Sequence, residues 1–162
     1  LVGKEKVGTL VRNSFPLADS SVSGEAALLT QKTVTGSGTG TARLASPNWS
    51  LRLNERVSLI DDGRMRYDAL YDSDVRVEAV VTATGANTEW ELGVALNGGP
   101  PEERSLVNGV IQGSGGLNTL RSPITFQDIS SGADDSFSPF IENTGGTTDL
   151  DVVRATLELI EV

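Results

Sequence analysis

An alternation of apolar and polar residues with a period of two constrains this chain more than any other feature of its sequence. The longest run is Asp74–Thr84, in which every second residue from Val75 to Ala83 is apolar. All the residues between them are polar or charged except Val80. A period of two is typical of a strand with one buried face, whereas an amphipathic helix repeats about every 3.6 residues. The run therefore predicts a β-strand whose odd-numbered residues face a core.

The same alternation recurs along the chain from residue 42 onward. Asp62-Gly63 and Asn97-Gly98 predict tight turns between strands, because Asp, Asn and Gly tolerate the positive φ that such turns require. Pro100-Pro101 predicts a loop, because proline cannot donate to a sheet ladder. We expect about eight strands, over residues 49–59, 65–67, 74–84, 90–96, 104–111, 120–129, 136–143 and 150–162. The fold class is therefore all-β, an antiparallel β-sandwich or a jelly roll.

Two of these strands carry an irregularity. In the last one, the apolar phase shifts from Leu150 and Val152 to Val153 and Ala155. A shift of one residue is what a β-bulge accommodates, so we expect a bulge there. Pro139 interrupts the strand before it and predicts an edge position or a second bulge.

The first 41 residues differ from the rest of the chain. Short apolar clusters stand among Ser, Gly and Thr, and residues 35–41 form a polar tract of Gly, Ser and Thr. Residues 24–31 are compatible with one or two helical turns, with Ser23 as a weak N-cap. We therefore expect an extended N-terminal arm over residues 1–41 and a jelly-roll domain over residues 42–162.

Charge is distributed unevenly along the chain. Residues 1–56 hold seven basic and four acidic residues, and residues 57–162 hold six basic and eighteen acidic residues. The net charges are +3 and −12, which make the total of −9. Such an acidic body repels phosphate backbones, so we expect no nucleic-acid partner. A basic leading segment is suited to an acidic protein surface, although incidental charge on a solvated arm is an equal alternative.

The chain also resembles a known family through an ordered series of short motifs. The series comprises Asp62-Gly63-Arg64-Met65-Arg66-Tyr67, Ala95-Leu96-Asn97-Gly98-Gly99, the turn before Asp135, Phe140-Ile141-Glu142-Asn143 and Ala155-Thr156-Leu157-Glu158-Leu159. Together these motifs resemble the jelly-roll domains of tailed-phage virion proteins that are similar to tumour necrosis factor (TNF) and C1q. The resemblance covers residues 57–162. It departs from the family pattern at Asp134-Asp135, where Gly-Asp is usual.

The resemblance implies a homotrimer in which one sheet of each subunit packs toward a threefold axis. Val80 and Phe140 each lie on the face opposite the main apolar set of their strand. They are therefore our candidates for the trimer interface. Phe140 could instead cover the end of its own core.

Composition argues against catalysis. The chain has no cysteine and no histidine, which removes thiol nucleophiles, thiolate zinc sites and the usual imidazole base. The acidic pairs Asp61-Asp62, Glu102-Glu103 and Asp134-Asp135 lie in predicted turns and are more readily explained as solvated residues than as glycosidase carboxylates. Asp72 with Asp74, and Asp149 with Asp151, have a spacing compatible with calcium, but a full ligand set is not visible. We therefore predict no enzyme activity, no cofactor and no metal.

We expect a trimeric capsid decoration (cement) protein, located on the virion at the capsid surface, whose partner is the major capsid protein. The apolar runs are too short for the roughly 20 residues of a membrane helix, so we expect no membrane partner. The candidate capsid-anchoring residues are Lys4, Lys6, Val7, Leu10, Val11 and Arg12.

Two alternatives to the decoration protein remain open. One is a receptor-binding head of a tail or head fibre, attached to a fibre or tail protein and presenting loops to a host glycan or protein. Its candidate exposed-loop residues are Asn97, Glu102, Glu103 and Asn118. The other is a non-viral C1q-like ligand-binding module.

Overall fold

The computed structural model describes residues 23–28, 32–34, 41–43, 49–60, 64–68, 71–130, 135–145 and 148–162. These residues form ten strands and one short 3₁₀ turn, η3 (Glu103–Ser105). The strands are β1 (Ser23–Leu28), β2 (Lys32–Val34), β3 (Thr41–Arg43), β4 (Trp49–Glu55), β5 (Val57–Ile60), β6 (Arg64–Tyr67), β7 (Ser73–Leu96), β8 (Val107–Ile129), β9 (Ser136–Gly145) and β10 (Leu150–Glu161). Every strand pairing described is antiparallel, and the expected all-β jelly-roll sandwich is confirmed.

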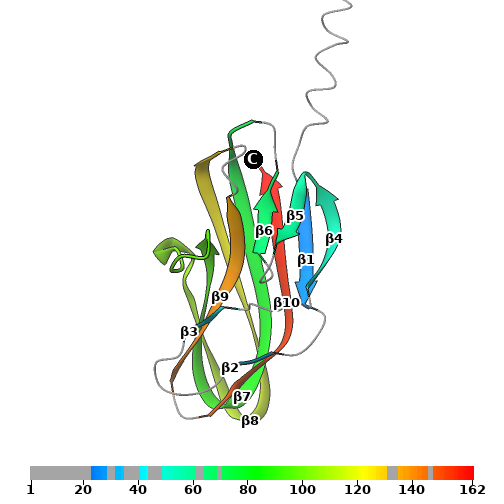
Figure 1. Cartoon of the computed structure of the whole chain (residues 1–162). Coiled ribbons are helices and arrows are strands. Elements are labelled where there is room, and N and C mark those ends of the chain that lie inside the picture. Colours follow the sequence, from blue (N-terminus) through cyan, green and yellow to red (C-terminus); the bar gives the residue numbers. More distant parts are fainter. Residues whose placement is uncertain are drawn as a thin grey trace, which may run out of the picture.

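The strands form two layers that share β7 and β8 (Figure 1). The first sheet has the order β4–β1–β10–β7–β8, with β2 also paired to β10. It uses the first half of β7 and the second half of β8. The second sheet has the order β8–β7–β9–β6–β5, with β3 also paired to β9, and it uses the other halves of β7 and β8.

The long strands β7 and β8 correct the prediction of shorter, separate strands. Residues 74–84 and 90–96 are both part of β7, and residues 104–111 and 120–129 fall largely within β8. The two strands bend together where register shifts flank Ala86 and where Gly113 and Gly115 have φ of 75° and 77°. This bend is the lower end of the sandwich in Figure 1. Glycine tolerates such backbone angles without strain, so the ladder continues through the tract expected to be a loop.

The core forms as the period-two pattern predicts. Val75, Val77, Ala79, Val81 and Ala83 are all fully buried on one side of β7. Larger side chains pack against this layer. Among them, the ring of Phe126 in the first-sheet half of β8 lies 4.9 Å from the ring of Phe137 in β9 of the second sheet. Aromatic pairs at this separation contribute beyond their buried area.

Strand β1 corrects two predictions about the N-terminal region. Residues 23–28 are a strand, not helical turns, and they lie between β10 and β4 within the first sheet. The sheet therefore begins before the predicted domain boundary at residue 42. Gly24 makes this placement possible, because a Cβ there would lie 2.4 Å from Val57 Cγ2. Sheet pairing outweighs the weak helical signal of the short segment.

Three local predictions concern the hairpin at Asp62-Gly63, the bulge in the last strand and the position of Pro139. β5 and β6 pair as a hairpin around Asp62-Gly63, as expected, although these two turn residues lie outside the described part of the chain. A register shift between Val152 and Arg154 confirms the bulge in β10, but Val153 is the exposed extra residue and not a core residue. On one side of β9, Pro139 pairs with Val94 of β7. On the other side, β6 pairs with the residues before Pro139 and β3 pairs with the residues after it.

The segment from Pro101 to Leu106 folds back onto the end of β7. The Glu102 N–H donates to the Val94 carbonyl, and the Val94 N–H donates to Ser105 Oγ at 2.9 Å. Ser105 Oγ donates in turn to the Glu102 carbonyl at 2.6 Å. Because Ser105 is only 1% exposed, its hydroxyl is the partner that satisfies a buried backbone N–H.

Ser105→Ala is therefore expected to lower the free energy of unfolding by about 1–3 kcal/mol, the cost of leaving a buried donor unsatisfied. Urea denaturation followed by circular dichroism measures the change. Ser114→Ala, at an exposed position of β8, is the control and should stay within about 0.5 kcal/mol of the parent. Equal effects of the two substitutions would contradict the proposed role of the Ser105 hydroxyl.

Candidate interaction surfaces

The first sheet has one face turned away from the core, which we call the open face. Four strand segments form it: β1, β10, the first half of β7 and the second half of β8. In each segment, the residues of the open face alternate with residues whose side chains point into the core. Its middle row runs across the four strands as Ala27, Thr156, Val80 and Arg121. Strand neighbours on one face lie about 5 Å apart, so these side chains form a continuous surface.

A row of three glutamates crosses the open face next to the middle row. Glu158 lies directly opposite Glu25 on one side and Glu78 on the other. Like charges in such positions repel, and arginines offset part of the repulsion. Arg52 lies 3.4 Å from Glu25, and Arg76 and Arg121 lie 3.1 and 2.9 Å from Glu78.

Glu158 forms no ion pair within the described ranges. Arg76, Glu78, Glu158 and Ile160 line a shallow depression of about 130 Å³. The glutamate row is thus the place on the open face where a cation from outside the chain would gain a partner.

The open face is nearly neutral on an otherwise acidic body. On this face its strands carry Arg76, Arg121 and Arg154 against the carboxylates Glu25, Asp74, Glu78, Asp128, Asp151 and Glu158, and Arg52 of the adjacent β4 pairs with Glu25. With Arg52 included, four basic and six acidic residues give a charge of −2, whereas residues 57–162 hold six basic and eighteen acidic residues. Among exposed apolar side chains of the described residues, Leu117, Val153 and Ile160 lie on this face.

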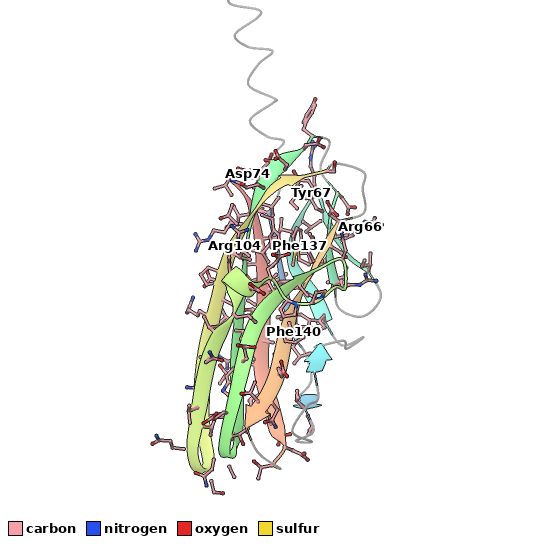
Figure 2. The ribbon with its side chains drawn as sticks, turned by 90° about the vertical axis from the view of Figure 1, so that its left-hand side faces the viewer. Arg66, Tyr67, Asp74, Arg104, Phe137 and Phe140 are labelled. Carbon is pink, nitrogen blue, oxygen red and sulfur yellow. The ribbon has the colours of Figure 1, made fainter. Side chains whose placement is uncertain are left out.

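The two candidates for the trimer interface lie on different sheets. Val80 is half-buried at the centre of the open face. Phe140 lies in β9 of the second sheet, opposite Gly93 and Arg43 (Figure 2). It is only 5% exposed, so its own chain already covers most of the ring. The two residues cannot contribute to one flat contact.

The four exposed-loop candidates lie in different settings. Asn97 is exposed with φ of 51°, and its side chain bridges Asp135 and the Ser136 N–H. Glu103 is exposed in η3, whereas Glu102 is half-buried. Asn118 is not in a loop: it is part of β8, and its Oδ1 accepts a hydrogen bond from Trp90 Nε1. Asn97 and Asn118 thus each make hydrogen bonds within the fold, and the prediction that Asn118 lies in a loop is wrong.

The candidate anchoring residues Lys4, Lys6, Val7, Leu10, Val11 and Arg12 lie outside the described residues. Within the described part, no three acidic side chains gather as a metal site would require. Asp74 Oδ1 accepts the Asp128 N–H, and Asp151 Oδ1 accepts the Thr33 hydroxyl, which explains these two carboxylates by hydrogen bonding. No helix in the described ranges is long and apolar enough to cross a membrane.

Tyr67 lies near the upper end of the sandwich in Figure 2, as does Asp74. Burial raises the pKa of its hydroxyl above the usual 10.0, and the charges of Glu161 and Asp72 raise the pKa further. The hydroxyl therefore stays protonated at neutral pH and donates to the Tyr71 carbonyl at 3.1 Å. It stabilises this end of the fold and is not a base.

Comparisons with known proteins bear on the fold. No protein-family model matches the sequence, and no curated protein matches it. The structure is similar to that of Eiger TNF from S. frugiperda, with a TM-score of 0.59 and 11% identity over 88% of this chain and 92% of that chain. It is also similar to murine APRIL, with a TM-score of 0.55 and 9% identity over 88% and 99% of the two chains. The chain therefore has a TNF-like jelly-roll fold.

Proposed function

We propose that this chain is a non-catalytic structural protein of a virion that assembles as a homotrimer, binds the outer surface of a capsid and stabilises the shell. The observation that carries the proposal is the open face of the first sheet, which combines exposed apolar side chains with near-neutral charge. The rest of the proposal is supported by the motif series of residues 57–162 and by the basic residues Lys4, Lys6 and Arg12 of the leading segment, residues 1–12.

Self-association through the open face follows from its charge and its apolar content. Two acidic bodies repel one another, so copies approach most easily through the surface with the smallest net charge. Burial of apolar area contributes roughly 25 cal/mol per Å² before the entropic costs of association. Ile160 and Val80 offer such area, while Glu158 has room for a cation of a second copy.

Binding to a shell is assigned to the leading segment. Lys4, Lys6 and Arg12 supply positive charge, and Val7, Leu10 and Val11 supply apolar side chains between them. A segment that orders on binding can cover a large surface even when each unit of area contributes little affinity. Three such segments on one trimer would act together and raise the avidity.

Reversing the charge of the leading segment tests the capsid assignment. Lys4→Glu, Lys6→Glu and Arg12→Glu together are expected to weaken binding to isolated shells of the parent virus at least tenfold, since attraction becomes repulsion. Co-sedimentation at several protein concentrations measures the affinity. The control is Arg104→Glu, at an exposed position of η3. Undiminished binding of the triple variant would overturn the anchoring role.

A second candidate is a ligand-binding module that acts away from any shell, because the two similar structures are named as Eiger TNF and APRIL. The fibre-head alternative stays open beside it. Quantitative mass spectrometry of purified particles separates the three functions. A copy number matching the shell supports the decoration protein, a copy number matching a fibre supports the receptor-binding head, and absence from particles supports the ligand module.

A further inference from the structure

The outer face of the second sheet holds several buried hydrogen-bond donors that have no partner. They are Arg56 Nη1, Ser58 Oγ, Arg64 Nε and Ser138 Oγ. We call these four residues the donor cluster. Buried polar atoms are nearly always paired in native proteins, and a group of unpaired ones requires an explanation such as a bound ion.

The strand register places three of the four residues on one face of neighbouring strands, with Arg64 next to Ser138 and Ser58 diagonal to Arg64 on the other side. β5 and β6 pair Ser58 with Arg66 and Ile60 with Arg64. Between β6 and β9, Met65 pairs with Phe137 and Arg66 pairs with Ser136. If this register is continued by one residue, Arg64 lies opposite Ser138. Val57, Met65 and Phe137 point into the core. Their strand neighbours Ser58, Arg64 and Ser138 therefore share the opposite face.

Arg56 lies at the end of the same hairpin. It immediately precedes β5, and its carbonyl accepts the Asp68 N–H. Within the described part of the chain, neither Arg56 nor Arg64 forms an ion pair. Arg66 differs from these two arginines, because its Nε lies 2.6 Å from Asp68 Oδ1 and its charge is neutralised by that carboxylate. The cluster thus retains two positive charges on a body that is otherwise strongly acidic.

The chemistry of these donors selects the ligand class. A guanidinium presents N–H groups in a planar fork that matches two oxygens of one oxyanion. Hydroxyls add further donors, and Ser138 is only 2% exposed, so its orientation is set by the fold. We infer that the donor cluster is an oxyanion-binding site, which takes a carboxylate, sulfate or phosphate group either as a free ion or on a saccharide. This inference does not depend on the proposed function.

Titration of the full chain with sodium sulfate, sodium acetate and sodium glucuronate tests the inference. The readout is the Nε–Hε signal of each arginine in ¹H–¹⁵N NMR spectra at constant ionic strength. We expect the Arg64 signal to shift and saturate with at least one anion, while the Arg104 signal does not. Tighter binding of glucuronate than of acetate assigns the site to a saccharide carboxylate, and equal or weaker binding assigns it to the free ion. No saturable shift of Arg64, or an equal shift of Arg104, would overturn the site.

Variants provide a second measurement. Arg64→Gln is expected to weaken binding of the best anion at least tenfold, and Arg104→Gln is the matched control, since Arg104 is exposed and lies apart from Arg66 in Figure 2, with Phe137 between them. Ser138→Ala removes an unpaired hydroxyl, so it should leave the ion-free protein at least as stable while weakening anion binding severalfold. Unchanged affinity in both Arg64→Gln and Ser138→Ala would contradict the site even if the parent binds anions.

Discussion

Trp90→Ala is expected to lower the free energy of unfolding by about 3–5 kcal/mol. Trp90 is fully buried in the second-sheet half of β7. Its Nε1 donates at 3.1 Å to Asn118 Oδ1, which belongs to the first-sheet half of β8. The substitution leaves a large cavity and also an unpaired amide oxygen between the two layers. Urea denaturation followed by far-ultraviolet circular dichroism measures the loss.

Trp90→Phe separates the two contributions. Phenylalanine fills much of the space but cannot donate to Asn118, so we expect a loss of about 1–3 kcal/mol, smaller than that of alanine. Gly109 lies against the same indole, since a Cβ there would be 2.9 Å from Trp90 Nε1. The site is therefore too closely packed to collapse around alanine at little cost. A loss below about 1 kcal/mol for Trp90→Ala would show that the two sheets do not depend on this contact.

Val80→Glu is expected to convert the proposed trimer into monomers. Val80 lies at the centre of the open face, and Glu78 and Glu158 already cross that face in the adjacent row. A further carboxylate in each of three packed copies would bring like charges together in a desolvated contact, where their repulsion is least screened. Light scattering after gel filtration should show the mass falling from three times the 17.0 kDa of the chain to one.

Val110→Glu is the matched control for this experiment. Val110 is 53% exposed, and it lies on the outer face of the second sheet because its neighbour Ile111 is buried in the core. The same change of side chain there should leave the trimer intact. If Val80→Glu also remains trimeric, or if both variants dissociate, the open face is not the specific interface. Circular dichroism confirms that each variant is folded.

The predictable part of the fold is the part encoded by neighbouring residues. The alternation in Asp74–Thr84 identifies the strand and its core face, because successive side chains of a strand point to opposite sides. The phase change after Val152 likewise identifies the bulge in β10. It does not identify Val153 as the exposed residue, since which residue a bulge leaves unpaired depends on the partner strand.

The placement of β1 and the continuity of β7 and β8 could not be predicted in the same way. Residues 23–28 carry little strand signal of their own, and they become a strand because β10 and β4 pair with them on both sides. Gly113 and Gly115 are typical of a loop, but paired strands on both sides of the tract carry the ladder through it. Pairing between distant segments stabilises these conformations, and it is invisible to any local pattern.

The candidate surfaces were also predictable only in the part that neighbouring residues encode. Alternation shows that Val80 and Phe140 leave the main apolar face of their strands, but not that one is central on an open face and the other is covered by its own chain. The donor cluster had no sequence signal beyond scattered arginines and serines, because its residues come from three strands and from Arg56 before β5, and strand register determines which of them are neighbours.

By itself, the sequence determined the all-β class, the core face of the longest strand and the asymmetry between a basic leading segment and an acidic body. These properties depend on residue type and spacing along one chain. Only the tertiary structure decided which strands are neighbours, which apolar residues remain exposed and which charges are left without a partner. Those properties arise from contacts between residues far apart in sequence. Strand register and burial determine whether a side chain finds its partner within the chain or remains available to another molecule.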